Sequence, residues 1–323
     1  MNIQLLGTSS GTPTNTRNVS ATAVWAGQAK RWYLVDCGEG TQYQLLKCSL
    51  SSANLKAVFI THVHGDHCFG LPGLISSMQL QGRTEPLQVF GPAGVREIVE
   101  TALTYSQAYM AFDIHYHLVD GSKTVYCDDS FAVQSCTLSH RVPSYAYCFE
   151  EVNLQARLRV DRLEQDGIPK GPLWGRIQRG EVITLENGAR IEPAQYLDNS
   201  RTPRIGVIAG DNDRPECLDQ FTRPIDVLVH EATFTEAVLQ HVGPKSQHSS
   251  SHRVAHYAQE RGIPNLVLTH FSARFGDSEG SAQSIALVEA EARAAYQGRL
   301  YLARDFDHYY LDSVHCLQKL NTH

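Results

Sequence analysis

Three histidines and one aspartate lie within six consecutive residues, directly after the short apolar run KAVFI. They are His62, His64, Asp66 and His67, in the pattern HxHxDH. In an extended segment, side chains two positions apart point the same way, so His62 and His64 can share one ligand direction. Asp66 and His67 follow a turn at Gly65. Imidazole and carboxylate groups at this density, behind an apolar strand, are the ligands that a zinc-like ion requires.

Three more candidate ligands end other apolar runs. The run FAVQSCTLSH ends at His140, RIGVIAGD at Asp211 and NLVLTH at His270. Each of the three could be an ordinary polar residue at a strand end, but strand ends on one edge of a sheet converge on one crevice. Because the HxHxDH cluster is present, we favour the interpretation that these three residues also bind the metal. Seven donors suit two metal ions bridged by a carboxylate such as Asp211, the arrangement that stabilises the attacking and leaving oxygens in a displacement at phosphorus.

The elements that position these residues alternate between strand and helix patterns, which predicts an α/β layered fold. We expect a single domain over residues 1–323, with an inserted arm at about 152–199, where Gly and Pro interrupt the pattern. The strand and helix pairs are 31–41 with 42–48, 56–60 with 69–80, and 86–92 with 95–105; further strands are expected at 2–10, 131–140, 204–211, 224–232 and 265–272, and further helices at 251–262 and 284–298.

Composition narrows the class of protein. The chain has 323 residues, 42% of them apolar, and a formal net charge of −6, which argues against a protein that coats nucleic acid indiscriminately. No window approaches the roughly 18 apolar residues of a membrane helix, and the chain begins with a strand pattern, so we expect a cytoplasmic protein without membrane contact. The eight cysteines include no CxxC pair, which favours free thiols over disulfides.

The arm differs from the rest of the chain in charge. Between residues 152 and 180 it carries six basic residues and three acidic ones, and is a candidate contact surface for an anion. The basic residues are Arg157, Arg159, Arg162, Lys170, Arg176 and Arg179. A charged arm that is simply solvated is the alternative.

Taken together, these residues resemble the metallo-β-lactamase superfamily and, within it, the short-form tRNase Z (ribonuclease Z, or ribonuclease BN) family. The resemblance covers essentially the whole chain. It is carried by LLGTSSGTP, LVDCGEGTQYQLL, ITHVHGDHCFGLPGLI, VHEATF, HSSSH and LTHFSARF in this order, and by GIPKGPLWGRIQRGE in the arm. It implies an αβ/βα four-layer sandwich with an inserted flexible arm, and a phosphodiesterase that cleaves 3′ trailers from precursor tRNA, leaves a 3′-hydroxyl and in some cases trims as a 3′-exonuclease.

The resemblance implies two zinc ions per subunit, with Mn²⁺ or Co²⁺ as substitutes. One zinc would be held by His62, His64, His140 and Asp211, and the other by Asp66, His67, His270 and the bridging Asp211. A water or hydroxide shared by the ions would be the nucleophile, oriented and deprotonated by Asp66. His248 would donate a proton to the departing 3′-oxygen, supported by Glu231. A neutral imidazole is a poor donor to an alkoxide unless a carboxylate sustains its charged form. The alternative is that Glu231 braces the loop and His248 is a surface residue.

The same resemblance gives the arm a role. In relatives it clamps the elbow of a tRNA held in the partner subunit's active site, which implies a homodimer. The six basic residues of the arm would then contact phosphates without reading sequence. Arg17 and Asn18 match the end of a loop, PxKxRN in the family, that is associated with sensing the CCA end.

Three positions depart from the family. The loop reads PTNTRN, with Asn15 where Lys is usual, which puts discrimination against CCA ends in doubt. The usual GDT reads GDN, so Asn212 follows Asp211, and Ala146 stands where Gly is common. None of the three removes a metal donor.

Two other classes of function remain. A small-molecule hydrolase of the same fold, of β-lactamase or glyoxalase II type, would have no need of a basic arm. A metal-binding or redox module without hydrolysis would not need seven donors and a candidate acid, because a structural zinc is a closed four-ligand site.

Overall fold

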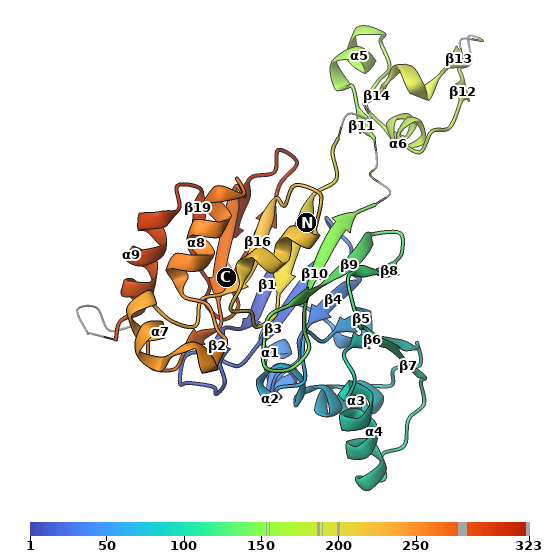
Figure 1. Ribbon diagram of the computed structural model, residues 1–323. Coiled ribbons are helices and arrows are strands. Elements are labelled where there is room, and N and C mark those ends of the chain that lie inside the picture. The colour runs from blue at the N-terminus through green and yellow to red at the C-terminus, as the bar shows by residue number, and fades with distance from the viewer. Residues whose placement is uncertain are drawn as a thin grey trace. The chain divides into compact units, whose positions relative to one another are not determined.

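The structure, a computed structural model, describes residues 1–320 except 153, 155, 186, 187, 189, 199, 200 and 277–282. The chain forms two compact units (Figure 1). The body consists of Met1–Glu150 and Arg204–His323, and the arm consists of Glu151–Pro203. No helix among the described residues is long and apolar enough to cross a membrane, and all eight cysteines are free thiols.

Two mixed sheets form the centre of the body. In spatial order the first contains β21 (Leu317–Leu320), β20 (His308–Leu311), β1 (Asn2–Gly7), β3 (Ala21–Trp25), β4 (Trp32–Val35), β5 (Leu55–Phe59), β6 (Leu87–Gly91) and β7 (Ile114–Leu118). The second contains β19 (Arg299–Leu302), β17 (Asn265–Thr269), β16 (Val227–Glu231), β15 (Ile205–Ala209), β10 (Ser144–Glu151), β9 (Phe131–Leu138) and β8 (Lys123–Cys127). A short pair, β2 (Ser9–Ser10) and β18 (Phe271–Ser272), links the loops after β1 and β17.

Three apolar clusters separate four layers. Side chains from both sheets, including Phe59 and Phe149, form the cluster between them. A second cluster covers the outer face of the first sheet with α1 (Thr41–Leu45), α3 (Leu71–Leu80) and α4 (Val95–Tyr105), near α2 (Gly65–Cys68) and the 3₁₀ turn η1 (Ser52–Asn54). The third covers the second sheet with α7 (Glu236–Val242), α8 (Ser251–Glu260), α9 (Ile285–Ala295) and the turn η3 (Pro215–Gln220), while η4 (Pro244–Ser246) leads towards α8. The four-layer sandwich expected from the sequence is confirmed.

The register of the strands brings polar residues together at one edge of the sandwich. β4 and β5 pair in parallel with Val35 opposite Phe59, and β16 and β17 pair in parallel with Glu231 opposite Thr269. Parallel neighbours that end level with one another place the residues that follow them side by side. Both sheets therefore direct the loops after these strands to one crevice.

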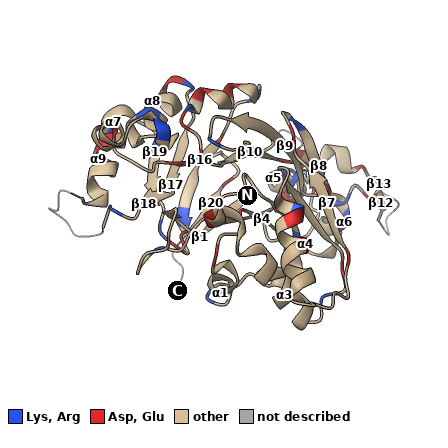
Figure 2. Cartoon of the chain, turned by 60° about the horizontal axis from the view of Figure 1, so that its bottom comes forward, with Lys and Arg blue, Asp and Glu red and all other residues tan. Residues whose placement is uncertain are grey.

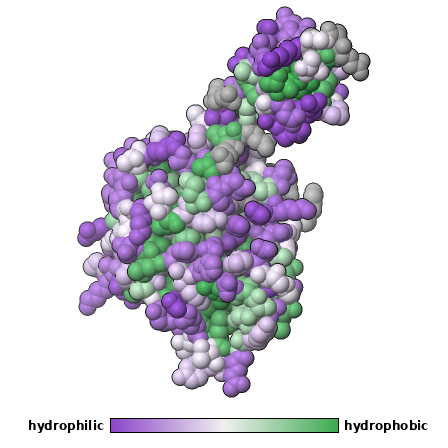
Figure 3. All heavy atoms as spheres, turned by 90° about the vertical axis from the view of Figure 1, so that its right-hand side faces the viewer, coloured by the Kyte–Doolittle hydropathy of each residue, from purple (hydrophilic) through white to green (hydrophobic). Residues whose placement is uncertain are grey.

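The arm folds around an apolar cluster of its own, in which Leu163, Trp174 and Ile177 are buried. Its elements are β11 (Arg157–Leu158) paired with β14 (Leu197–Asp198), β12 (Ile183–Thr184) paired with β13 (Arg190–Ile191), α5 (Val160–Gln165), α6 (Pro172–Gln178) and the turn η2 (Pro193–Gln195). Figure 3 shows hydrophilic residues around a hydrophobic centre on its visible side. The arm is thus a small folded unit as well as an insertion.

Charge on the body is mixed. In Figure 2, Lys and Arg are interspersed with Asp and Glu along α8 and its neighbours. Arg253 of α8, for example, pairs with Glu236 of α7 at 2.9 Å, and Arg261 pairs with Asp219 at 3.2 Å. This neutralisation agrees with the modest net charge of the chain.

Candidate metal centre

All seven donors predicted from the sequence lie in one crevice of the body. They form two groups, and within each group the ligand atoms all lie within 4.8 Å of one another. The first group contains His62, His64, His140 and Asp211, and the second contains Asp66, His67 and His270. Each donor follows the carboxyl end of β5, β9, β15 or β17, so strand ends position the whole set.

The first group is tightly drawn together. Nδ1 of His64 lies 3.1 Å from Nε2 of His62 and 3.2 Å from Nε2 of His140. Oδ2 of Asp211 lies 3.6 Å from Nε2 of His62 and 3.8 Å from Nε2 of His140. Three imidazole nitrogens and one carboxylate oxygen therefore face a common point.

The second group shares the same aspartate through its other oxygen. Nε2 of His67 and Nε2 of His270 lie 3.2 Å apart. Oδ2 of Asp66 lies 3.5 Å from the first and 3.3 Å from the second. Oδ1 of Asp211 lies 3.4 Å from Nε2 of His67 and 3.3 Å from Nε2 of His270. Asp211 thus presents one oxygen to each group, which is the geometry of a bridging carboxylate.

These separations fit divalent metal ions. A tetrahedral ion with metal–nitrogen bonds of about 2.0–2.1 Å holds its ligand atoms roughly 3.3 Å apart. Burial lowers the pKa of His62, His64 and His140, which favours the neutral imidazole that a metal binds. The donor set therefore suits a zinc-like ion in chemistry as well as in spacing.

The carboxylates make the crevice strongly negative. Burial alone lowers the pKa of His67, but three carboxylates around it outweigh burial and raise its pKa well above the ordinary value. They belong to Asp211, Asp36 and Asp66. For Asp211, burial acts in the opposite direction and raises the pKa. The neighbouring imidazoles, with His270 the strongest, outweigh burial and hold the pKa of Asp211 well below its usual range. The negative electrostatic potential that keeps a buried imidazole protonated also favours the binding of a divalent cation in the crevice.

Four of the imidazoles are oriented by a contact at the nitrogen that faces away from the centre. Nδ1 of His140 donates to the carbonyl of Gln247 at 2.9 Å, and Nδ1 of His270 lies 3.0 Å from the hydroxyl of Thr233. Nδ1 of His62 lies 3.0 Å from the hydroxyl of Thr61. Such contacts fix the tautomer and the ring angle of a ligand.

The fourth oriented imidazole depends on Asp36, which the sequence analysis missed. Nδ1 of His67 donates to Oδ2 of Asp36 at 2.7 Å, and Thr61 donates its amide and its hydroxyl to the same carboxylate at 2.8 and 2.9 Å. Asp36 follows β4 directly and has a positive φ of 61°. Its signal was visible, because LVD has the same strand-end pattern that identified Asp211.

The structure also brings together the predicted acid and its support. Nδ1 of His248 lies 3.0 Å from Oε2 and 3.2 Å from Oε1 of Glu231, which is buried. Burial lowers the pKa of His248, but the charge and hydrogen bond of Glu231 outweigh burial and raise it to about 9. The same imidazole lies 3.6 Å from Oδ2 of Asp211. His248 can therefore stay protonated at neutral pH beside the metal ligands.

Asn212 connects this pair to the bridging aspartate. Its amide donates to Oε1 of Glu231 at 2.7 Å, and its carbonyl accepts from the hydroxyl of Ser249 at 2.6 Å. Its side-chain amide donates to Nε2 of His230 at 3.2 Å, and this buried histidine was not singled out from the sequence. The residue that departs from the usual GDT therefore joins three segments of the site.

The chain resembles known proteins over nearly its whole length. A ribonuclease Z of Marinobacter nauticus is 44% identical over 321 residues, which are 99% of each chain. The chain belongs to the ribonuclease Z family. The crystal structure of human tRNase Z, short form, superimposes with a TM-score of 0.65 at 25% identity, covering 95% of this chain and 98% of the human one.

Two further likenesses concern the fold. A metallo-β-lactamase fold protein of Bacillus subtilis superimposes with a TM-score of 0.64 at 16% identity, covering 95% of this chain and 98% of the other. Residues 1–146 also match the family profile described as anti-Pycsar protein Apyc1. That stretch includes the HxHxDH cluster and His140 but ends before Asp211.

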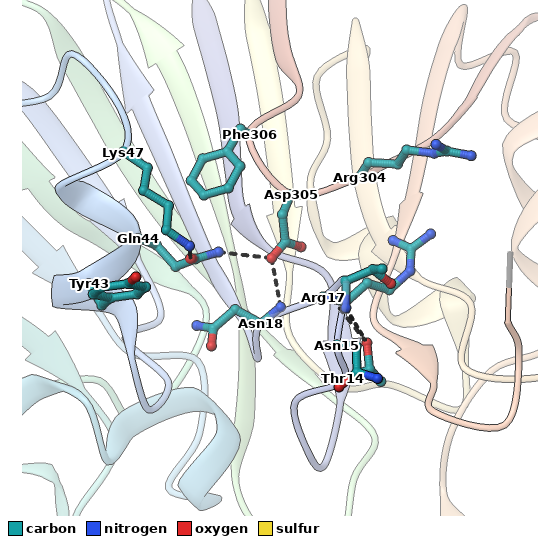
Figure 4. A pocket seen from close by; sticks show the side chains of 11 residues that line it. Thr14, Asn15, Arg17, Asn18, Tyr43, Gln44, Lys47, Arg304, Asp305 and Phe306 are labelled. Atoms are coloured by element: carbon teal, nitrogen blue, oxygen red, sulfur yellow. Dashed lines mark hydrogen bonds between the residues drawn. The ribbon is translucent and has the colours of Figure 1, made fainter.

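In this family member, Arg17 and Asn18 lie on the loop that follows β2. Nη1 of Arg17 donates at 2.7 Å to both the hydroxyl of Thr8 and the carbonyl of Ala303, and only 7% of the residue is exposed. The side chain of Asn18 donates to the carbonyl of Glu39 at 2.9 Å. Both residues line a cavity of the body (Figure 4), and the exposed Asn15 lies on the same loop.

The six basic residues assigned to RNA lie in the arm, and all are exposed. Three of them form ion pairs: Arg162 with Asp166 at 3.0 Å, and Arg176 and Arg179 both with Glu181 at 2.9 Å. Within the described residues, Arg157, Arg159 and Lys170 have no ion-pair partner. Arg157, Arg159 and Arg162 line one hollow of about 530 Å³.

Proposed function

We propose that this member of the ribonuclease Z family removes the 3′ trailer of precursor tRNA as a metal-dependent endoribonuclease, with the seven-donor crevice as its active site. The observation that carries the proposal is Asp211, whose two oxygens face the two ligand groups while the pair of His248 and Glu231 lies beside it. Two-metal centres with an adjacent acid are suited to phosphodiester cleavage.

We propose two zinc ions, one for each ligand group, with Asp211 shared between them. When bound, such ions polarise a phosphodiester and lower the pKa of water towards neutrality. The donor set supports this assignment because imidazole nitrogen and carboxylate oxygen are preferred zinc ligands. Mn²⁺ and Co²⁺ accept the same donors and serve as substitutes.

The chain's own residues would handle the protons. Oδ2 of Asp66 accepts a hydrogen bond from the amide of Gly11 at 2.7 Å, which fixes the carboxylate so that it can orient a water molecule and accept its proton. His248 uses Nδ1 to contact Glu231, so Nε2 is free to donate a proton to the departing 3′-oxygen. A protonated imidazole held by a carboxylate is a competent acid near neutral pH.

The arm would position the tRNA. Arg157 and Arg159 form no ion pair among the described residues, so their guanidinium groups are available to phosphates. We further propose that two chains form a homodimer, so that the arm of one holds tRNA bound to the other. Such an interface would cover apolar side chains of the body that are exposed in the single chain, among them Leu46, Phe69 and Leu80.

The test is to incubate zinc-loaded protein with a precursor tRNA that carries a 3′ trailer and to map the product ends at single-nucleotide resolution. We expect one cut after the discriminator base, leaving a 3′-hydroxyl. Asp211→Ala should abolish the cut and lower the bound metal, while Asp120→Ala, which removes an exposed carboxylate, should change neither. Intact RNA under zinc, manganese and cobalt would overturn the proposal and leave a small-molecule hydrolase to be tested.

A further inference from the structure

A separate group of metal-binding side chains lies on α8, on the outside of the body (Figure 1). His252 and His256 are four residues apart and both exposed, and the exposed Glu260 follows after four more residues. Residues four apart on a helix are neighbours on one face. The side of α8 that packs on the body contains Val254, Ala255, Tyr257 and Ala258. Three potential ligands therefore face solvent along one stripe of the helix.

The two imidazoles of this stripe are close enough to share an ion. Their ring centroids lie 6.1 Å apart. In the crevice, the ring centroids of His62, His64 and His140 lie between 4.7 and 5.1 Å apart, so the gap on α8 is only slightly wider. Both side chains on α8 are exposed and can rotate between staggered conformations. The rings can therefore close on an ion without any change of the backbone.

Glu260 leaves one nitrogen of its neighbouring histidine free for an ion. Its Oε2 lies 3.4 Å from Nδ1 of His256, so Nε2 of this ring is the nitrogen available to a metal. A carboxylate on the far nitrogen of a ligand fixes the ring and makes it a better donor. Within the part of the chain that the structure describes, the ring of His252 forms no hydrogen bond and no ion pair. Both histidines therefore have a nitrogen to offer.

The backbone beneath the stripe is held firmly. The hydroxyl of Ser250 accepts from the amide of Arg253 at 3.2 Å, and the carboxylate of Glu291 accepts from the amide of His252 at 3.0 Å. The positive charge of Arg253, which lies between the two histidines in the sequence, is paired with Glu236 at 2.9 Å. A fixed backbone and a neutralised neighbour both favour the binding of a dication here.

Another pair of exposed histidines, on β7, has a different geometry. His115 and His117 both contact the side-chain amide group of Gln88, at 3.2 and 2.7 Å. The ring of His117 also stacks on Phe90, with centroids 4.4 Å apart. These contacts would have to break before the two rings could share an ion. The pair on β7 is therefore a matched control for the pair on α8.

We infer that α8 carries a further metal site, in which His252 and His256 together bind one Zn²⁺, Ni²⁺ or Cu²⁺ ion. Imidazole nitrogen suits these ions, whereas Mg²⁺ and Ca²⁺ take oxygen ligands. Two histidines four residues apart on one helix face also bind zinc in the HExxH helix of metalloproteases. Only two protein ligands hold the ion and water completes its coordination, so this site should release its ion more readily than the crevice does. The inference does not depend on the proposed function.

Counting bound metal tests the inference. The probe is Zn²⁺, and the zinc bound by the full chain is measured by equilibrium dialysis over a range of free zinc concentrations. Wild type should bind one equivalent more than His256→Ala, whatever the crevice itself binds. His252→Ala should lose the same equivalent, because a single imidazole without its neighbour should bind about 100-fold more weakly. His115→Ala should bind as much zinc as wild type, and excess Mg²⁺ should not displace the additional ion.

Two results of this count would overturn the inference. One is an equal amount of zinc in wild type and His256→Ala, and the other is loss of the additional equivalent in His115→Ala. Glu260→Gln should keep the site but weaken it by about tenfold, since the charge behind the ligand is lost.

Hydrogen exchange then locates the ion. An ion that joins two turns binds only the folded helix and so stabilises it. Zinc should therefore slow exchange of the α8 amides more in wild type than in His256→Ala. If the additional equivalent binds while α8 exchanges equally in the two proteins, the ion lies elsewhere and the inference is overturned.

Discussion

The imidazole of His67 donates its Nδ1 proton to the carboxylate of Asp36 at 2.7 Å, while its Nε2 faces the ligand atoms of the centre. The contact fixes which nitrogen is free to bind a metal. It also places a negative charge behind the ligand, which makes the imidazole a better donor. Asp36 is therefore as much a part of the centre as the residues that face the metal.

Replacing Asp36 with asparagine should weaken metal binding. The amide group cannot accept the Nδ1 proton and hold the Thr61 hydroxyl as the carboxylate does, so the ring loses its fixed tautomer. We expect a 10- to 100-fold loss of affinity for the ion in the second ligand group, measured by chelator competition. Asp128→Asn removes another hydrogen-bonded carboxylate, one that contacts Tyr33 and Tyr126. Unchanged metal affinity in Asp36→Asn alongside this control would contradict the orienting role.

The pair of His248 and Glu231 predicts a particular pH profile. Because Glu231 outweighs burial and raises the pKa of His248 to about 9, the protonated form predominates below that pH. Cleavage of precursor tRNA should therefore decline as pH rises through about 9. Glu231→Gln removes the charge that sustains the proton, so the decline should move to lower pH and kcat at neutral pH should fall by about 10²–10⁴-fold.

A substrate that needs no proton provides the control for this pair. The leaving group of bis(4-nitrophenyl) phosphate is a weak base, so its departure does not depend on an acid. Glu231→Gln should then lose far more activity on tRNA than on this diester. Equal losses on both substrates would mean that Glu231 supports the metal centre rather than the acid.

The seven candidate donors, which the structure brings together in one crevice, could be picked out from the sequence because they combine two independent signals. Dense imidazole and carboxylate groups are rare outside metal sites, and each donor ends an apolar run that the α/β pattern reads as a strand. Asp36 carries only the second signal, and single carboxylates at strand ends are common. Gln247 acts through its backbone carbonyl and has no signal in the sequence at all.

The fold was predictable where pairing is local and less so where it is not. The expected strand at 56–60 corresponds to β5, and the one at 265–272 is divided at His270 into β17 and β18. The strands β20 and β21 were not expected, and β20 pairs with β1 from the opposite end of the chain, where Asn2 meets Tyr310. The edge strand β7 has the sequence IHYHL, whose histidines interrupt the apolar pattern. Short-range periodicity does not reveal such pairings.

Asn212 should contribute to stability as well as to alignment. Its side chain accepts from the amide of Ser139 at 3.1 Å and donates to Nε2 of His230, and both bonds are buried or nearly so. Asn212→Ala leaves these groups without a partner, which costs about 1–3 kcal/mol of unfolding free energy. Asn212→Thr replaces the amide with a hydroxyl that can restore one of the two bonds, so this variant should lose less. Denaturant titration of both variants, with the exposed Asn15→Ala as control, measures the difference.

The arm offers a matched comparison between free and paired cations. Arg157 and Arg159 form no ion pair among the described residues, whereas Arg176 and Arg179 both contact Glu181. If the free pair contacts phosphates, the double variant Arg157→Ala with Arg159→Ala should weaken tRNA binding. It should also reduce the slope of log affinity against log salt by about 2, one unit for each lost contact.

The control is the double variant Arg176→Ala with Arg179→Ala, which removes the same amount of charge from the same unit. Its guanidinium groups must leave Glu181 before they can reach a phosphate, so we expect a smaller loss of affinity and a smaller change of slope. Neither variant should alter hydrolysis of bis(4-nitrophenyl) phosphate, since that reaction needs only the metal centre of the body. Equal losses of tRNA binding in the two variants would show that net charge, not the free pair, determines the contribution of the arm.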